Sequence, residues 1–431
     1  MRTAGVLDEV PPTPPLAISV TESGGARVAP PRTWATSGRV RRNRTAAVVL
    51  VAAVAALLAY VLTDGGPSAS VGATSHPHRA VAGNPRLDES WDGDGQPVTL
   101  VFGGDVNFPR GSVLGSRLAA HPATALGPGA HQLLARSDLA MVNLETALTF
   151  GGCPVPQPKQ YVFSAPPSAI TALRGAGATL VTEANNHGED CGAPGLTQAL
   201  TIRARAHYRV IGIGGNARQA FTSYQSVLHG ERIGIIAATQ VIDSDLAATW
   251  TATDTQPGLA SAYQVQALVD AVRSARRVDD TVVVFLHWGI QLDACPDPQQ
   301  EPLARLLVRA GADIVIGSHA HVLLGAGYLG SAFVDYGLGN FAFYNDPPPT
   351  NVSGALAITV TGRHIDTYAW RPAIIEGELP VPVTGAAAHE VQARLVGARG
   401  CTDLTAHPTA ALATPASEGA GVPLGQLREL G

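Results

Sequence analysis

The sequence contains almost no lysine. Lys159 is the only lysine among 431 residues, so arginine supplies nearly all of the positive charge. The formal net charge at pH 7 is −5, and aromatic residues make up only 5% of the chain. A protein that binds nucleic acid through its phosphates carries a concentrated basic surface. The composition gives no sign of such a surface, so we expect no nucleic-acid partner.

Cysteine is also scarce. The chain has four cysteines, which are Cys153, Cys191, Cys295 and Cys401. None of them forms a C-x-x-C pair, so nothing supports a zinc ribbon. An even number of cysteines in an oxidising compartment is typical of disulfides. We therefore expect two disulfides, for which three connectivities are possible.

Long apolar runs are missing apart from one. Residues Thr45–Thr63 carry no charge and are nearly all apolar, and their length is close to the roughly 20 residues that cross a bilayer. Arginines crowd the segment Arg39–Arg44 before this run, so the positive-inside rule places the N-terminus in the cytoplasm and the later residues outside. A cleaved signal peptide is the alternative, but the long polar lead argues against it. We therefore predict a single-pass protein of the cell membrane.

The remaining chain divides by composition. Residues 1–44 are rich in proline, serine and glycine and predict a disordered cytoplasmic tail before the transmembrane helix at 45–63. Residues 64–96 have the low complexity of a linker. We expect the main domain at 97–385 and a partly disordered C-terminal extension at 386–431.

From Pro97 onward, short apolar runs alternate with helical patterns. Continuous runs such as "VTLVFGG", "TVVVFLHWG" and "ADIVIGSHA" are typical of strands covered on both faces. Stretches such as "SAYQVQALVDAVRSAR" have helical periodicity. This alternation predicts an α/β domain.

Polar residues that can bind metal or phosphate follow these apolar runs directly. They are Asp105, Asn143, Glu145, Asn185, Asn186, His187, His287, His319 and His321. The carboxyl ends of strands in α/β folds share one edge, where ligands bind, so we expect these side chains to converge. Each is weak evidence alone, since Asp105 could cap a helix and His287 could be a core histidine. Their nitrogen and oxygen donors suit Zn, Mn or Fe, whereas Cu(I) prefers sulfur.

Six motifs in order extend this interpretation. They are "GGDVNFPRG", "VNLETALT", "EANNHGEDCGAPGL", "LHWGIQLDACPDPQQ", "GSHAHV" and "DYGLGNF". Together they resemble the poly-γ-glutamate capsule biosynthesis CapA family, of the calcineurin-like metallophosphoesterase superfamily, over roughly residues 97–346. The resemblance implies a two-sheet β-sandwich flanked by helices, with strand-end loops that hold two divalent metal ions, which could be Mn, Zn, Fe or Mg.

The resemblance also implies roles for individual residues. Asp105 would bind the first metal, and Asn107 stands where related phosphoesterases have a histidine ligand. Glu145 replaces a bridging aspartate and is one carbon longer. The other implied metal ligands are Asn186, His287, His319 and His321. The two departures leave open whether two metals bind tightly and whether phosphoesterase activity survives.

Several further residues are candidates for substrate contact or support. His187 would reach the scissile phosphate and donate a proton near neutral pH. Asp190 would either orient His187 or cap a helix. Arg110 would either bind an anion or be a solvated surface residue. Asn143 and Asn340 are expected behind the ligands, although Asn340 could also be a turn residue.

The cysteines lie close to these segments in the sequence. Cys153 and Cys191 each follow a predicted site segment. We therefore expect Cys153 to pair with Cys191, which leaves Cys295 for Cys401.

A glycine-rich segment, "GIGGNA" at residues 212–217, matches a dinucleotide-binding fingerprint. The acidic residue that such a site needs about twenty residues later is not at the end of a second strand. We therefore interpret the segment as a tight turn.

These patterns favour a metal-dependent hydrolase or transferase that acts in the synthesis, export or attachment of poly-γ-glutamate or another anionic cell-surface polymer. The alternative is a non-catalytic assembly subunit of a membrane polymer synthase that uses the metal site structurally. A third possibility, a binding module for acidic polymer, would require a basic groove. The net charge of −5 and the scattered arginines do not predict one.

Overall fold

The computed structural model describes residues 95–344 and 347–412. The predicted cytoplasmic tail, the predicted transmembrane helix at 45–63 and nearly all of the predicted linker lie outside these residues. Within the described ranges, no helix combines the length and apolar character needed to span a bilayer.

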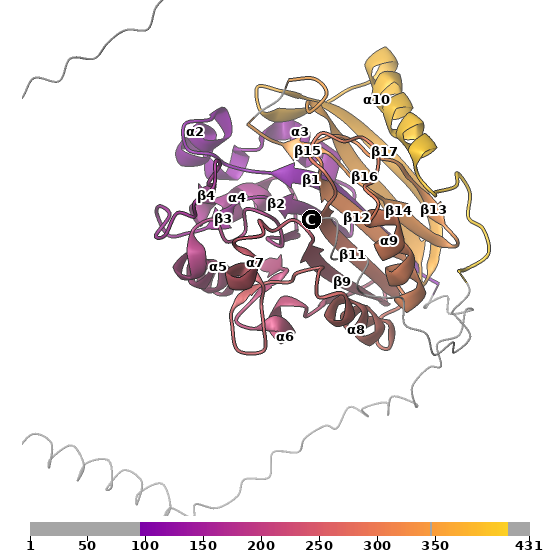
Figure 1. Ribbon diagram of the computed structural model, residues 1–431. Helices are drawn as coiled ribbons and strands as arrows, with labels where there is room; N and C mark the ends of the chain where they lie inside the picture. Colours follow the sequence, from indigo (N-terminus) through magenta and orange to yellow (C-terminus); the bar gives the residue numbers. More distant parts are fainter. Residues whose placement is uncertain (1–94, 345–346, 413–431) are drawn as a thin grey trace, which may run out of the picture. The chain divides into compact units, whose positions relative to one another are not determined.

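The described residues form two β-sheets that pack face to face, with helices on their outer faces (Figure 1). In the first sheet, β1, β2, β5 and β6 run parallel and β16 to β18 continue antiparallel on the other side. Its order is β18 (Leu379–Pro382), β17 (His364–Glu376), β16 (Val352–Thr361), β1 (Val98–Val106), β2 (Leu139–Leu144), β5 (Leu180–Thr182) and β6 (Arg209–Ile211), with β15 (Asn340–Ala342) also paired to β1.

The second sheet has four parallel strands between two antiparallel edge strands. Its order is β13 (Ala326–Leu329), β14 (Ala332–Asp335), β12 (Ile314–His319), β11 (Thr281–Trp288), β9 (Glu231–Thr239) and β8 (Tyr224–Leu228). Two small pairs join β3 (Ala147–Leu148) to β4 (Ser164–Ala165) and β7 (Ile213–Gly214) to β10 (Gly258–Leu259). The predicted α/β class is therefore confirmed.

Helices cover both sheets. The α-helices are α2 (Val113–Ala120), α3 (Gly127–Leu134), α4 (Ser168–Gly175), α5 (Gly192–Ala206), α6 (Ala217–Ala220), α7 (Ala247–Trp250), α8 (Val265–Arg276), α9 (Gln300–Ala310) and α10 (Gly385–Ala398). Short 3₁₀ turns occupy Pro122–Thr124 and Arg399–Cys401. α2 to α5 pack on the first sheet, whereas α8 and α9 pack on the second.

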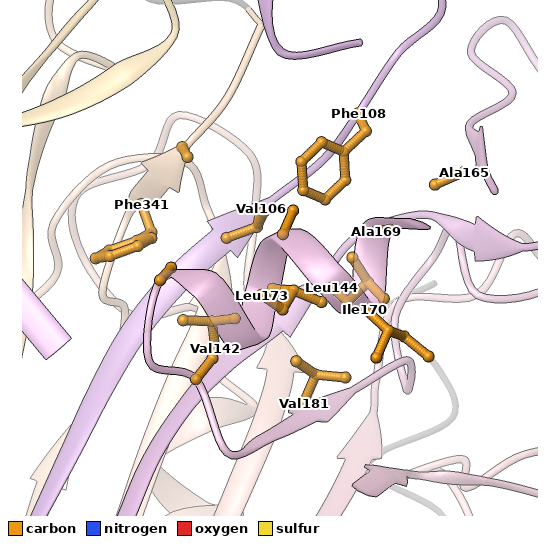
Figure 2. Packing of buried hydrophobic residues seen from close by; sticks show 14 of the residues in the cluster. Val106, Phe108, Val142, Leu144, Ala165, Ala169, Ile170, Leu173, Val181 and Phe341 are labelled. Atoms are coloured by element: carbon orange, nitrogen blue, oxygen red, sulfur yellow. The ribbon is translucent and has the colours of Figure 1, made fainter. Parts of the chain in front are cut away.

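The alternation of side chains along β1 explains the layering. Leu100 and Phe102 point into the core between the two sheets, whereas Val101 points to the core beneath the helices. Successive residues of a strand face opposite sides, so an uninterrupted apolar run can serve two cores at once. Figure 2 shows the helical side of this arrangement, where Ile170 and Leu173 of α4 lie over β2 and β5.

Glycine allows β1 to approach the segment before β15. A Cβ atom at Gly104 would lie 1.8 Å from the carbonyl oxygen of Gly339, so no other residue fits there. The close approach lets Asp105 N donate a 3.1 Å hydrogen bond to Gly339 O and sets Asp105 opposite Asn340. The glycines of "VFGGD" and "GLGNF" thus bring two predicted site segments together.

Both predicted disulfides are present. Cys153 bonds to Cys191 and Cys295 bonds to Cys401, with Cα–Cα distances of 4.9 and 5.7 Å. The second bridge ties the segment after α10 to the main domain. α10 itself lies within residues 386–431, the predicted extension, apart from its first residue, and its Val391 and Leu395 are buried in the core.

Candidate metal centre

The strand-end residues converge at the carboxyl ends of the parallel strands of both sheets. Asp105 lies near the end of β1, Glu145 directly follows β2, His287 lies near the end of β11, and His319 ends β12. Two donor groups result, which are Glu145, His287 and His319, and Asp105, Glu145 and His321. Within each group the ligand atoms lie within 4.8 Å of one another. Glu145 belongs to both groups, as a bridging ligand would.

Glu145 is fully buried, and neither of its carboxylate oxygens has a hydrogen-bond partner among the described residues. Its Oε1 lies 3.8 Å from His187 Nε2, 3.9 Å from His287 Nε2 and 3.8 Å from His321 Nε2. Burial raises the pKa of Glu145 well above its ordinary value, and the neighbouring charge of Asp105 raises it further. A buried carboxylate without partners is costly, so its oxygens are suited to a cation.

Asn107 gives a second, independent sign of a missing ligand. The residue is fully buried, and neither its amide oxygen nor its amide nitrogen has a partner in the described parts of the chain. Buried amides in proteins are nearly always hydrogen-bonded. Asn107, which stands where related phosphoesterases have a histidine ligand, therefore offers an amide without a hydrogen-bond partner among the described residues.

The histidines differ in their protonation. Burial lowers the pKa of His319 to about 3, and the neighbouring His321 adds to the effect. Burial and His319 lower the pKa of His287 well below its ordinary value. Burial would also lower the pKa of His321, but Glu145 and Asp105 raise it to about 9. Two neutral imidazoles and two carboxylates attract a cation, and metal ions bind neutral imidazole.

The backbone at the end of β12 is unusual. His319 and His321 have φ angles of +99° and +57°, in the left-handed region that side-chain-bearing residues seldom adopt. His319 N donates to Asp105 Oδ2 at 3.2 Å, which helps to hold this conformation. Such backbone strain concentrates at functional sites. Here it turns both imidazoles toward the carboxylates.

Asn143 links the donors from behind. Its Nδ2 donates to Asp105 Oδ1 at 2.8 Å and lies 3.1 Å from His287 Nδ1. Its Oδ1 accepts from Asn185 Nδ2 at 2.9 Å, which fixes the orientation of the amide. Ser318 Oγ also lies 3.0 Å from His287 Nδ1 and can accept a hydrogen bond from that nitrogen, in the tautomer whose Nε2 lone pair could bind a metal.

Two other asparagines contact the histidines directly. Asn186 Oδ1 lies 2.7 Å from His287 Nε2, so both atoms face the same point. Asn340 Oδ1 lies 2.8 Å from His321 Nδ1, which leaves His321 Nε2 directed toward Glu145. Asn340 Nδ2 donates to the carbonyl of Thr350 at 3.1 Å, so this amide is also fixed.

His187 is oriented by a chain of charges. Its Nδ1 lies 2.5 Å from Asp190 Oδ2, which also accepts from Phe163 N at 2.7 Å. Asp190 Oδ1 accepts from Lys159 Nζ at 2.8 Å. Of the two roles predicted for Asp190, the structure has the orienting one, because α5 has no side-chain cap. Burial lowers the pKa of His187, and Asp190 opposes that change.

A cavity of about 530 Å³ opens beside these donors, and its walls include Lys159, Asn186, His187, His321 and Asn340. Aromatic rings back the two histidines. Phe163 packs 4.3 Å from His187, and Phe343 packs 4.7 Å from His321, measured between ring centroids. A substrate in this cavity would therefore lie against the donors.

Of the two alternatives predicted for Arg110, the structure agrees with the solvated surface residue. This residue is exposed and does not line the cavity, because the chain turns at Pro109–Gly111 into α2 and leads Arg110 away. The cation at the cavity is instead Lys159, whose side chain is only 9% exposed and lies 4.9 Å from the centroid of Trp250. The sequence offered one signal for it, since a chain that otherwise uses arginine has a single lysine.

The donor set fits hard or borderline divalent metals. It consists of carboxylate, amide and imidazole groups without sulfur, which suits Zn, Mn or Fe better than Cu(I). The unpartnered oxygens of Glu145 and the unpartnered amide of Asn107 support this fit. Asp105, Glu145, Asn186, His287, His319 and His321 could hold metal ions, while His187 and Lys159 face the adjoining cavity.

Comparison with known proteins indicates the family of this chain. The family model described as "Bacterial capsule synthesis protein PGA_cap" matches residues 99–345. A solved structure of a putative 5'-nucleotidase from Staphylococcus aureus is a distant likeness. It is 15% identical, covers 70% of this chain and 58% of that one, and has a TM-score of 0.38.

Two relatives are more similar in sequence. Capsule biosynthesis protein CapA of Bacillus anthracis is 31% identical over 53% of this chain and 55% of that protein. PGA biosynthesis protein CapA of Bacillus subtilis (strain 168) is 28% identical over 57% of this chain and 64% of that protein. The matches therefore span less than two thirds of either relative. The family model, in contrast, covers more than half of this chain, and the chain belongs to the bacterial capsule synthesis PGA_cap family, as its resemblance to CapA proteins predicted.

Proposed function

We propose that this protein takes part in the synthesis, export or attachment of poly-γ-glutamate or another anionic capsule polymer, as a metal-dependent hydrolase of the phosphoesterase type. The observation that carries the proposal is the pair of donor groups that share Glu145, whose oxygens have no other partner among the described residues. The names of its relatives, capsule biosynthesis and PGA biosynthesis proteins, supply the biological setting.

The proposed location is the outer face of the cell membrane. The apolar segment Thr45–Thr63 would anchor the chain, with the domain outside and membrane polymer-synthase subunits as possible partners. Two disulfides support an oxidising compartment, because disulfides persist there and are rare in the cytosol.

The chemistry follows from the positions of the side chains. Bound divalent metals would polarise a phosphoryl oxygen and lower the pKa of a bound water. His187 Nε2 faces Glu145, because Asp190 holds the other ring nitrogen. His187 would donate a proton to the leaving oxygen. Lys159 would attract an anionic group of the substrate into the cavity.

The test uses the full chain, its metal content and a phosphoester probe such as bis-p-nitrophenyl phosphate. Wild-type protein should carry a divalent metal and hydrolyse the probe. His187→Ala should keep its metal but lose about 10²- to 10⁴-fold in kcat, as expected for a general acid. The matched control is His364→Ala, since His364 is an exposed histidine whose side chain lies 2.8 Å from Asp366, away from the metal donors.

Two results would contradict the proposal. If the protein takes up no Mn, Zn, Fe or Mg, the donor groups do not form a metal site and the proposal is wrong. Protein that holds metal but hydrolyses no phosphoester, and for which His187→Ala changes nothing, would favour a non-catalytic assembly subunit instead.

A further inference from the structure

A second cavity, of about 660 Å³, lies between the segment from α5 to β6 and the segment from α6 to β8. None of its lining residues lines the cavity at the metal donors. The lining residues used below are Arg203, His207, Tyr208, Arg209, Gln219 and Tyr224. We call this cavity the arginine cavity.

The arginine cavity lies where the outer edges of the two sheets meet. Among the described strands, β6 is the last strand of the first sheet and β8 is the last strand of the second. Residues of both strands line the cavity, including Arg209 and Tyr224. Edge strands leave main-chain polar groups that the sheet does not use. The walls therefore combine side-chain donors with a sheet edge.

The charge of this region is one-sided. Between Asp190 and Glu231 the sequence has four arginines and no acidic residue, in a chain whose net charge is −5. In residues 95–344 and 347–412, neither Arg203 nor Arg209 forms an ion pair. Arginines elsewhere in the same ranges, such as Arg276, do pair with carboxylates. Within the described residues, no carboxylate therefore lies at ion-pairing distance from Arg203 or Arg209, although the charge of Arg203 interacts with Glu183.

A purely structural role accounts for only part of this charge. Arg203 NH1 donates to the carbonyls of Val210 and Ile213 at 3.2 and 3.0 Å, which fastens α5 to the strands that follow. Arg209 donates no hydrogen bond within the described residues, and its guanidinium lies 5.7 Å from the centroid of Tyr224. The structural role of holding α5 against the following strands thus explains part of the charge of Arg203. It does not explain the charge of Arg209, which makes no such hydrogen bond.

We propose that the arginine cavity binds a chain of carboxylates, as a second site that is separate from the metal centre. Guanidinium groups match carboxylates through two parallel hydrogen bonds. Gln219 and the main chain of the edge strands add neutral donors to the same walls. A chain that carries carboxylates at intervals can contact Arg203 and Arg209 together, which a single small anion cannot do as well. The inference rests on the proposed function, which supplies the acidic polymer, and the site would hold that polymer at the meeting edges of the two sheets.

A nucleic acid is the other polyanion to consider, and the rings favour the carboxylate chain. Nucleic-acid strands gain much of their affinity from bases that stack on exposed aromatic rings. Here Arg209 covers Tyr224, and Arg174 lies 5.2 Å from the centroid of Tyr208. With these ring faces covered, the cavity offers charge and hydrogen bonds to a ligand without bases.

The test measures binding of a fluorescently labelled γ-linked glutamate decamer to the full chain, by anisotropy at 50 and 150 mM salt. Wild-type protein should bind it, more weakly at the higher salt. Arg209→Gln should weaken binding at least fivefold, because it removes a cation whose guanidinium donates no hydrogen bond within the described residues. The matched control is Arg309→Gln on α9, which removes an equally exposed arginine outside the cavity and should change affinity less than twofold.

Two further arms separate this proposal from its rivals. Protein stripped of metal with a chelator should bind the decamer as tightly, so an inactive metal centre would leave this proposal standing. Single-stranded DNA of equal charge should bind at least fivefold more weakly. The proposal is overturned by absent decamer binding, by equal losses in Arg209→Gln and Arg309→Gln, or by DNA that binds as tightly as the decamer.

Discussion

Buried carboxylates at the two ends of the parallel strands differ in how many hydrogen bonds they accept. At the amino ends, Asp313 precedes β12 and accepts from Arg276 NH1 at 2.6 Å, from Arg363 Nε at 2.9 Å and from Val282 N at 2.9 Å. At the carboxyl ends, Glu145 is equally buried, yet within the described residues its oxygens accept no hydrogen bond.

This difference distinguishes a carboxylate that stabilises the fold, such as Asp313, from a carboxylate that is available to a ligand, such as Glu145. A buried ion whose hydrogen bonds are complete is part of the scaffold, and removing one partner is destabilising. A buried ion left incomplete lowers stability until something binds it. The amino ends should therefore govern the free energy of unfolding, and the carboxyl ends should govern metal affinity.

The largest effect is expected from Asp313→Asn. The change leaves the Arg276 guanidinium buried without its counter-ion, so the free energy of unfolding should fall by about 3–5 kcal/mol. Urea denaturation measures this loss, and metal content should stay at the wild-type level. Asp270→Asn is the control, because its pair with Arg273 is 3.6 Å long and exposed, and such pairs contribute about 0–1 kcal/mol. Equal losses in both variants would mean that burial does not set the energy of the pair.

The next effect is expected from Glu145→Gln. An amide cannot supply the anionic oxygen that two metals would share, so metal affinity should fall at least tenfold, about 1.4 kcal/mol. In the presence of a chelator, the free energy of unfolding should be unchanged or higher than that of the wild type, because the change removes a buried acid whose oxygens accept no hydrogen bond within the described residues. Calorimetric titration with Mn and denaturation in a chelator measure the two quantities.

The control for that experiment is again Asp313→Asn, but the quantity measured is its metal affinity, which should equal that of the wild type. If Glu145→Gln lost stability in the chelator and kept its metal, the proposed separation of the two ends would be wrong.

The convergence of donors was predictable because it follows from local patterns. Asp105, His287 and His319 come at the ends of apolar runs, and parallel strands gather such ends at one edge. Disulfide pairing was predictable for a related reason, since Cys153 and Cys191 flank segments that meet at that edge.

Other features depend on tertiary contacts that the sequence does not signal. Lys159 reaches Asp190 and the carbonyl of Asn186 across a loop, and the sequence marks the residue only as the single lysine of the chain, without indicating these contacts. Arg110 has the spacing of an anion-binding residue, yet a turn leads it into solvent. The arginine cavity forms between edge strands of two different sheets. Arg203 and Arg209 are six residues apart in the sequence, but the cavity that they line is completed by residues of α6 and β8.

The smallest effect tests a carboxylate that belongs to neither class. Glu183 directly follows β5 but is not among the metal donors, and burial raises its pKa to about 8, although the hydrogen bond from Leu148 N and the charge of Arg203 oppose the rise. Because the pKa of Glu183 in the folded state exceeds its ordinary value of 4.5, the folded state holds a proton that the unfolded state loses. Stability from Glu183 is thus complete below about pH 4.5 and falls as pH rises toward 8.

Glu183→Gln should remove this dependence. Between pH 5.5 and 7.5, the wild type should lose up to about 1.4 kcal/mol more per pH unit than the variant, while groups common to both cancel. Urea denaturation at several pH values measures the slopes, and the exposed Glu390→Gln is the control that should follow the wild type. Parallel slopes for wild type and Glu183→Gln would show that Glu183 is already ionised in the folded protein. Its charge would then be compensated like that of Asp313, and the carboxyl ends would hold scaffold charge as well as ligand charge.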